Sequence, residues 1–179
     1  MNRRSAFPAV IRSFHLPRAD EMALQTVRST LSPESERNLG ALLHLFGTEV
    51  GTRRHSFGYS PTAATSRWML LASTQDSDEV IGYAASVTLD LFGQCHGLIT
   101  DLAVLPEYRR QGVAQSLIVG VGGIFAAHQD PRVTTIAAIV PARRHSALDT
   151  FIIAGFEVMA QGDECLFHLP INHRAPAHC

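Results

Sequence analysis

The sequence contains no lysine, because all 15 of its basic residues are arginine. A lysine Schiff base and the lysine of a P-loop are therefore excluded. The formal net charge is −1, which gives no basic field for general nucleic-acid binding. Charged residues make up only 17% of the 179 residues and hydrophobic residues 46%. This composition predicts a packed globular chain and excludes disorder as its main state.

Cysteine is also scarce. Cys95, Cys165 and Cys179 form no CxxC pair, so neither a disulfide framework nor a zinc site is expected. The histidines are scattered without an HExxH pair, and no metal is predicted. No apolar run approaches the roughly 18 residues of a membrane span, and the apolar stretch near the start is too short for a signal peptide. We expect a cytoplasmic protein without a membrane partner.

The order of elements predicts a single domain over residues 1–179, with its core at about 10–170, a flexible N-terminal lead and a flexible tail at 170–179. Hydrophobic periodicity predicts helices over 19–30, from the N-cap Ser32 onward, over 113–128 and over 147–154. Strands are predicted over 10–14, 68–73, 79–89, 95–104, 133–140, 156–160 and 165–169, with a long loop over 51–66. The result is an α+β fold whose sheet is mixed and mainly antiparallel, with one strand–helix–strand unit.

One segment carries chemistry. Residues 101–118 run from a strand through a tight loop, Arg109 to Ala114, into a helix. The first N–H groups of a helix have no helical partner and lie at the positive end of its dipole, which favours a phosphate group. Gly112 lets a ligand approach the backbone, and Arg109 and Arg110 add charge. The glycines at 120, 122 and 123 lie inside the helix and predict close packing on the sheet.

Arg109-x-x-Gly112-x-Ala114, preceded by Asp101-Leu-Ala-Val, resembles the acyl-CoA-binding motif of the GCN5-related N-acetyltransferases, the GNAT superfamily. A second stretch, Ala147 to Phe156, resembles the family's later signature, a helix that ends in Gly-Phe before a strand. The element order fits the family across roughly residues 10–170.

The resemblance implies an N-acetyltransferase that moves an acetyl group from acetyl-CoA to the primary amine of a small-molecule or peptide acceptor by direct attack. It implies a splayed parallel pair of strands, with pantetheine paired to the backbone of Leu102, Ala103 and Val104 and the acceptor entering over 31–66. The residues implied for the cofactor's phosphates and remaining contacts are Arg109, Arg110, Gln111, Gly112, Val113, Ala114, Arg144 and Phe151. The family often forms dimers, so a homodimer is compatible with the sequence.

The chain departs from the family where Phe151 replaces a tyrosine that protonates the leaving thiolate. Either the thiolate leaves unaided or with a proton from water, or Ser146 or His145 donates, or the protein is a non-catalytic acyl-CoA-binding or regulatory module. Asp101 is the candidate base, and its alternative role is a structural carboxylate that holds backbone N–H groups. His96 lies on the other face of the same strand unless a bulge intervenes. Arg144 either meets the 3′-phosphate of CoA or belongs to a solvated loop.

Overall fold

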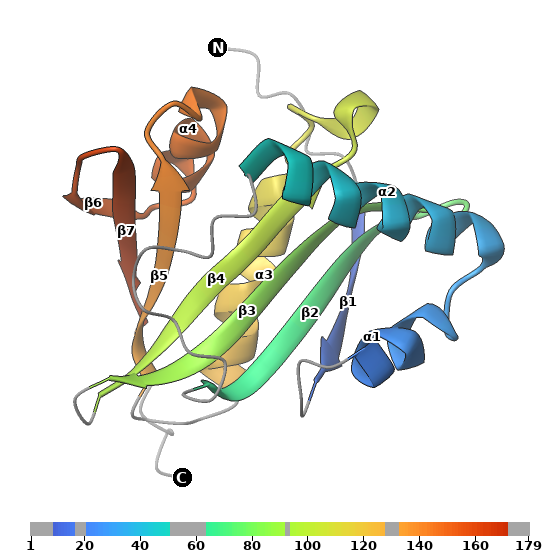
Figure 1. The fold of residues 1–179 in the computed structure, drawn as a ribbon, viewed down its shortest axis with the longest axis horizontal. Helices are drawn as coiled ribbons and strands as arrows, with labels where there is room; N and C mark the ends of the chain where they lie inside the picture. Colours follow the sequence, from blue (N-terminus) through green and yellow to red (C-terminus); the bar gives the residue numbers. More distant parts are fainter. Residues whose placement is uncertain (1–8, 17–20, 51–63, 92–93, 128–132, 172–179) are drawn as a thin grey trace, which may run out of the picture.

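The computed structural model describes residues 9–16, 21–50, 64–91, 94–127 and 133–171. Within these ranges, seven strands form one sheet in the order β1-β2-β3-β4-β5-β7-β6 (Figure 1). The strands are β1 Ala9–His15, β2 Ala64–Thr74, β3 Val80–Leu91, β4 Gln94–Val104, β5 Val133–Pro141, β6 Glu157–Ala160 and β7 Glu164–Pro170. β4 and β5 are parallel, and every other neighbouring pair is antiparallel. The mixed, mainly antiparallel sheet predicted from the sequence is confirmed.

Helices cover both faces of the sheet. They are α1 Glu21–Arg28, α2 Pro33–Val50, α3 Val113–Ala127 and α4 His145–Ile153, with a short 3₁₀ turn, η2, over Pro106–Tyr108. In Figure 1, α2 crosses in front of the central strands and α3 runs behind them. Among the residues that the structure describes, no helix is both long and apolar enough to cross a membrane.

The larger core lies between the sheet and α3. Its buried members include Leu70, Ile81, Leu117 and Ile136, and it continues under α4 through Phe151. On the opposite face a second core joins α1 and α2 to the sheet. Its buried members are Val27, Leu39, Leu42, Met69, Leu71, Val80, Tyr83 and Leu105. The apolar stripes that predicted the helices are therefore the stripes that the sheet buries.

Glycines set how closely α3 approaches the sheet. A methyl group at Gly120 would lie 2.8 Å from Leu70 Cδ2, so this glycine permits the contact between α3 and β2. On β4, a methyl group at Gly97 would lie 2.7 Å from the ring of Phe125. Gly123 has no atom within 4 Å of that position, so the packing role predicted for it is wrong.

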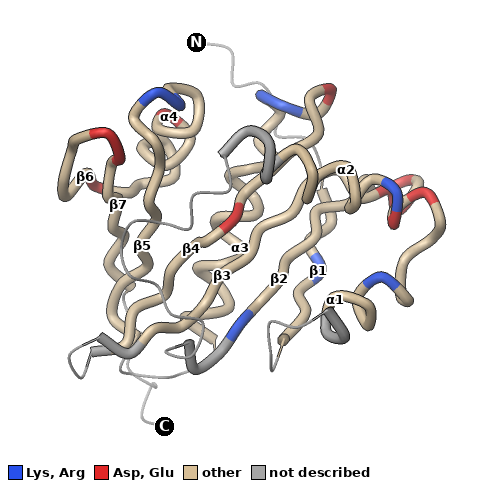
Figure 2. Tube along the Cα trace, viewed as in Figure 1, with Lys and Arg blue, Asp and Glu red and all other residues tan. Residues whose placement is uncertain are grey.

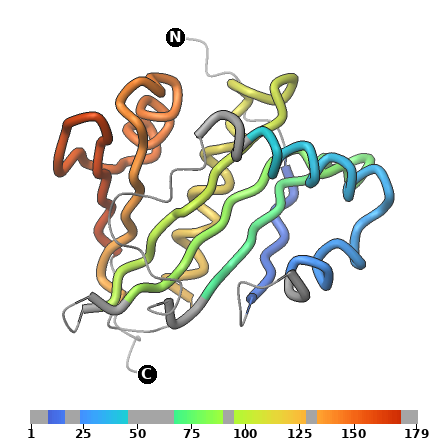
Figure 3. The backbone as a smooth tube through the Cα atoms, viewed as in Figure 1, coloured from blue at the N-terminus to red at the C-terminus, as the bar shows by residue number. Residues whose placement is uncertain are grey.

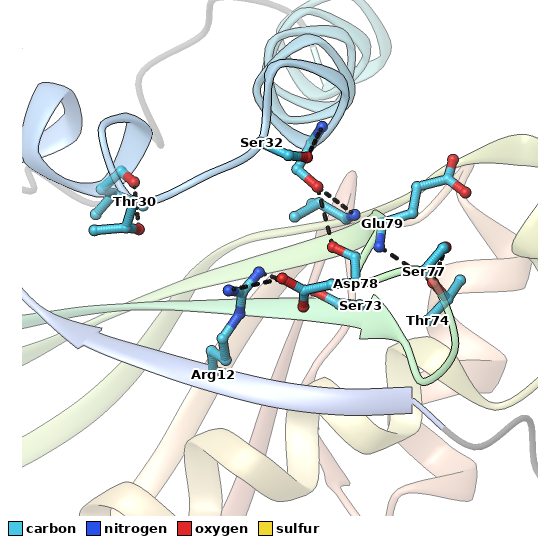
Figure 4. Close-up of polar contacts among 11 residues, drawn as sticks. Arg12, Thr30, Ser32, Ser73, Thr74, Ser77, Asp78 and Glu79 are labelled. Carbon is cyan, nitrogen blue, oxygen red and sulfur yellow. Dashed lines mark hydrogen bonds and ion pairs between the residues drawn. The ribbon is translucent and has the colours of Figure 1, made fainter.

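The start of α2 is fastened to the turn between β2 and β3 (Figure 4). The backbone N–H of Ser35 donates to Ser32 Oγ at 3.2 Å, which confirms Ser32 as the N-cap. Ser35 Oγ donates to the Asp78 carbonyl at 3.0 Å and accepts from the Val80 N–H at 3.3 Å. Arg12 of β1 forms an ion pair with Asp78 at 3.3 Å. These contacts fix α2 over the sheet, on the side where the acceptor is expected.

Several boundaries differ from the prediction, and two of the differences concern the site. β2 begins at Ala64 instead of residue 68, because β3 extends to Leu91 and the Ala64 backbone pairs with Leu89. The predicted loop over 51–66 is therefore wrong at its end. α4 begins at His145, two residues earlier than predicted. The rest of that loop, the N-terminal lead over residues 1–8 and the tail over 172–179 lie outside the described residues.

Candidate active site

The site begins where the two parallel strands part. β4 and β5 pair from Cys95 and Val133 as far as Ile99 and Ala138. Beyond that point β4 stays paired with β3 as far as Val104, and β5 stays paired with β7 as far as Pro141. The splayed parallel pair implied by the resemblance is present, and a cleft of about 680 Å³ lies between the two strands, α3 and α4.

The 109–114 loop closes one end of this cleft. Arg109 Nε donates to the Val104 carbonyl at 3.0 Å, which ties the loop to the end of β4. Arg110 and Gly112 have left-handed backbone angles, φ +61° and +85°. α3 then begins at Val113, and Gly112 to Gln115 line the cleft. The first N–H groups of a helix have no intrahelical partner, so the N–H groups of the first turn of α3 lie at this end of the cleft without one.

The 3₁₀ turn η2, which precedes this loop, is attached to α2 through hydrogen bonds to one carboxylate. Tyr108 of η2 lines the cleft, and its hydroxyl donates to Glu79 Oε2 at 3.3 Å. Glu79 Oε1 in turn accepts from Asn38 Nδ2 of α2 at 2.9 Å. Burial and the carboxylate of Glu79 raise the pKa of Tyr108, so its phenol stays neutral. A single carboxylate thus connects α2 to the entrance of the 109–114 loop.

Positive charge stands on both rims of the cleft. Figure 2 shows basic segments on the loop before α3 and on the turn before α4. Arg109 and Arg110 contribute from the first segment and Arg144 from the second, and all three line the cleft. Arginines at this spacing suit a ligand that carries several phosphates. Asp149 of α4 adds a carboxylate to the same wall.

A β-bulge in β4 determines which face Asp101 occupies. Ala85 of β3 pairs with Asp101, whereas the next residue, Ser86, pairs with Ile99, so Thr100 is the extra residue. Ile99 belongs to the core with α3, while Ala103 packs against the core with α2. The bulge therefore places Asp101 on the α2 side of the sheet, where it still lines the cleft.

The same bulge brings His96 to the α2 side, the outcome that regular pleating would not give. His96 Nδ1 lies 2.9 Å from Thr135 Oγ1 in the paired part of β4 and β5. His96 does not line the cleft. It therefore shares a face with Asp101 but stands away from the site.

Asp101 has a polar and a buried neighbour. Thr100 Oγ1 donates to Asp101 Oδ2 at 2.9 Å. Tyr83 on β3 is 2% exposed. Burial, and secondly the negative charge of Asp101, raises the pKa of Tyr83 far above its usual range. The half-buried Asp101 thus lies between the cleft and the core that contains Tyr83.

The α4 wall carries Phe151, at the position where the resemblance led us to expect a tyrosine. Its ring is 4% exposed, lies edge-on to Phe156 at 5.2 Å and stacks on Phe167 at 5.6 Å. Phe151 lines the cleft but has no proton to donate. Ser146 lines the cleft and is exposed, whereas His145 does not line it. Thr150 also lines it, but its hydroxyl donates to the Ser146 carbonyl at 2.8 Å.

The structure brings most of the candidate residues to one cleft. Those that line it are Asp101, Leu102, Ala103, Val104, Arg109, Arg110, Gly112, Val113, Ala114, Arg144, Ser146 and Phe151. Gln111 does not line it, and its side chain donates to the Glu107 carbonyl at 2.8 Å. The sequence analysis missed Thr100, Tyr108, Gln115, Ile139, Pro141, Asp149 and Thr150, which also line it. For Thr100 the available signal was its place directly before Asp101, and for Ile139 and Pro141 it was the end of a parallel strand.

The fold and the cleft define a class of α+β protein that opens its sheet between two parallel strands. Residues 48–121 match the model of the acetyltransferase (GNAT) family. This stretch contains β4, the 109–114 loop and the first half of α3. The resemblance found in the sequence is thereby confirmed over this stretch.

Solved structures share the fold over nearly the whole chain. The ribosomal-protein-S18-alanine N-acetyltransferase from Escherichia coli is similar at TM-score 0.51 and 16% identity, covering 96% of this chain and 99% of that one. A GNAT family N-acetyltransferase from E. coli in complex with CoA is similar at TM-score 0.54 and 18% identity, covering 96% and 86%. An aminoglycoside acetyltransferase from an uncultured soil metagenomic sample is similar at TM-score 0.55 and 15% identity, covering 85% and 91%. No curated protein sequence matches the chain.

Proposed function

We propose that the protein is an N-acetyltransferase that transfers the acetyl group of acetyl-CoA to the primary amine of a small molecule or peptide. The observation that carries the proposal is the cleft of about 680 Å³, which opens where β4 leaves β5 and ends at the start of α3. The geometry combines a free strand edge with a helix N-terminus, and arginines stand on both rims. The acceptor class is left open, since similar folds serve a protein-directed enzyme and an aminoglycoside enzyme.

The residues present suit an acyl-CoA. Beyond Ile99 the β5 side of β4 has no strand partner, so the backbone of Leu102, Ala103 and Val104 can pair with an extended ligand as an added strand would. The first turn of α3 and Arg110 suit a pyrophosphate, and Arg144 suits a further phosphate. When bound, acetyl-CoA supplies the acyl group in activated form, as a thioester.

Asp101 is the proposed base, and its carboxylate accepts the proton of the attacking amine. It lines the cleft from the α2 side of the sheet, opposite α4. Ser146 is the proposed donor toward the leaving thiolate, because it lines the cleft while His145 does not. Phe151 then serves as an apolar wall of the cleft.

The melting temperature with and without excess acetyl-CoA tests the first half of the proposal. A ligand at about 100 times its Kd adds roughly 2.7 kcal/mol to the free energy of unfolding, which shifts the melting temperature by a few degrees. If acetyl-CoA causes no shift and calorimetry also detects no binding, the cofactor assignment is refuted.

Replacement of Asp101 tests the second half. Asp101→Asn keeps the shape of the side chain but removes the base, so we expect turnover to fall by more than about tenfold while the Kd for CoA is unchanged. Turnover is followed as free thiol released with free amino acids, polyamines, aminoglycosides and peptides. Asp76→Asn makes the same change in the exposed turn after β2 and should leave turnover unchanged. Normal turnover with a lowered melting temperature in Asp101→Asn would assign the carboxylate a structural role instead.

A non-catalytic acyl-CoA-binding or regulatory module is the second candidate, and Phe151 favours it. The phenylalanine removes the proton donor that the family places at this position, and it is buried among Phe156 and Phe167. Binding of acetyl-CoA without thiol release on any amine of the panel would support this alternative.

A further inference from the structure

We propose that Thr100, the bulge residue of β4, is a positioning residue whose hydroxyl satisfies Asp101 both before and after the carboxylate takes up a proton. The proposal rests on the proposed function, in which Asp101 is the base. It assigns a role to the bulge, which otherwise interrupts the pairing of β3 and β4.

Thr100 Oγ1 stands between two acceptors. It lies 2.9 Å from Asp101 Oδ2 and 3.3 Å from the carbonyl oxygen of Ala85 on β3. A hydroxyl has one proton to donate and two lone pairs that accept, so it can serve only one of these acceptors at a time. The shorter distance to the carboxylate fits the ionised state of Asp101, in which the hydroxyl donates to Oδ2.

Protonation of Asp101 reverses the direction of this hydrogen bond. Asp101 Oδ2 gains the proton that the amine loses, and the new O–H donates to Thr100 Oγ1. The hydroxyl proton of Thr100 then turns to the Ala85 carbonyl, which has a second lone pair available. No covalent bond of Thr100 breaks in this exchange. In both states the half-buried carboxyl group keeps a hydrogen-bond partner at Oδ2. This arrangement lowers the reorganisation that proton uptake requires.

The other groups around Asp101 do not depend on Thr100. The titratable and charged side chains that line the same cleft are Tyr108, Arg109, Arg110, Arg144 and Asp149. From β3 the neighbour is the neutral phenol of Tyr83, and α2 packs its apolar Leu39 and Leu42 in the same core. Removal of the Thr100 hydroxyl therefore affects only its own hydrogen bonds, to Asp101 and to the Ala85 carbonyl, and leaves these charges in place.

The first test follows the titration of Asp101 itself and needs no acceptor. The protein is labelled at the aspartate carboxyl carbons and titrated by NMR with CoA bound, and Asp101→Asn identifies the signal. In Thr100→Val both states of Asp101 lose a hydrogen bond, but the bond to the ionised carboxylate is the stronger one. We therefore expect the midpoint to move upward by about half to one pH unit. Thr100→Ser should keep the original midpoint, and so should Thr30→Val, which removes a remote hydroxyl bonded to the Val27 carbonyl.

The second test uses an amine that the panel identifies as an acceptor. Thr100→Val should lower kcat about tenfold with an unchanged KM for acetyl-CoA, whereas Thr100→Ser should stay within about twofold of the original enzyme. If Thr100→Val does not fold, Thr100→Ala takes its place. An unmoved midpoint in the folded variant overturns the proposal, and so do equal losses of kcat in the valine and serine variants.

Failure of this proposal can be told apart from failure of the proposed function. If Asp101→Asn abolishes turnover while Thr100→Val titrates and turns over normally, the base is upheld and the role of Thr100 is refuted. If Asp101→Asn turns over normally, the base assignment itself is refuted.

Discussion

Arg110 holds a left-handed backbone conformation, φ +61°, at the turn that leads into α3. A residue other than glycine in this region carries strain of order 1–3 kcal/mol, yet the arginine lines the cleft. We expect Arg110→Asn to weaken CoA binding by about three- to tenfold, because a charge close to the phosphates is lost. The melting temperature should not fall, since asparagine tolerates this backbone angle well. Calorimetry of CoA binding measures the first effect and thermal unfolding the second.

The matched control for Arg110 is Arg37, an exposed arginine on α2. Arg37→Asn removes the same charge away from the cleft and should leave the Kd for CoA unchanged. Equal losses of affinity in both variants would mean that net charge, and not the position of Arg110, governs binding.

Two glycines of α3 that look alike in the sequence have different surroundings. A methyl group at Gly123 meets nothing within 4 Å, whereas one at Gly120 would lie 2.8 Å from the buried Leu70. Gly123→Ala should raise the free energy of unfolding by about 1 kcal/mol, because alanine is the better helix former. Gly120→Ala should show no such gain, since the clash offsets it. Urea unfolding of both variants is the measurement, and a loss in Gly123→Ala would contradict the open surroundings of that position.

At the scale of elements, the attachment of α2 depends on a buried hydroxyl. Ser35 is 1% exposed and bonds to the Asp78 carbonyl and the Val80 N–H. Ser35→Ala leaves both backbone groups without this partner, and we expect a loss of about 1–3 kcal/mol in the free energy of unfolding. Ser29→Ala is the control, because Ser29 is exposed and its hydroxyl donates to the Thr26 carbonyl of its own helix end. A loss in Ser35→Ala no larger than in Ser29→Ala would show that Ser35 does not hold α2.

The elements themselves were predictable because each carries its own pattern. Ser32 caps α2, and Gly155, at φ +92°, follows the end of α4, as helix capping predicts. The bulge at Thr100 was not predictable, since it depends on how β3 and β4 align and no residue type marks it. That single extra residue decides that Asp101 and His96 share a face of the sheet. The spacing of Asp101 and His96 in the sequence therefore could not show which face of the sheet each side chain occupies.

At the scale of the whole molecule, the sequence located the 109–114 loop but not the opposite wall of the cleft. A helix N-terminus after a strand is a local feature, whereas the parting of β4 and β5 depends on strands more than 30 residues apart, as the pairing of Ile99 with Ala138 shows. The ring of Phe125 rests on Gly97 within the paired half of these strands. Beyond Ile99 the pairing ends, and Ile139 and Pro141 become walls of the cleft.

This division of the sheet predicts where bound CoA changes backbone exchange. The β5 side of β4 lacks a strand partner from Thr100 to Val104, while the β3 side is paired from Asp101 to Val104. A ligand that lies along this edge should slow amide hydrogen exchange over 100–104 and over 110–115 by about tenfold or more at saturation. β1, at the far edge of the sheet, should exchange at its original rate and is the internal control. Slowing over 110–115 with unchanged exchange over 100–104 would mean that the loop holds the phosphates while the rest of CoA leaves the strand edge bare. In that case the parted strands would not serve as the cofactor site, and direct transfer to an amine in the cleft would lose its structural basis.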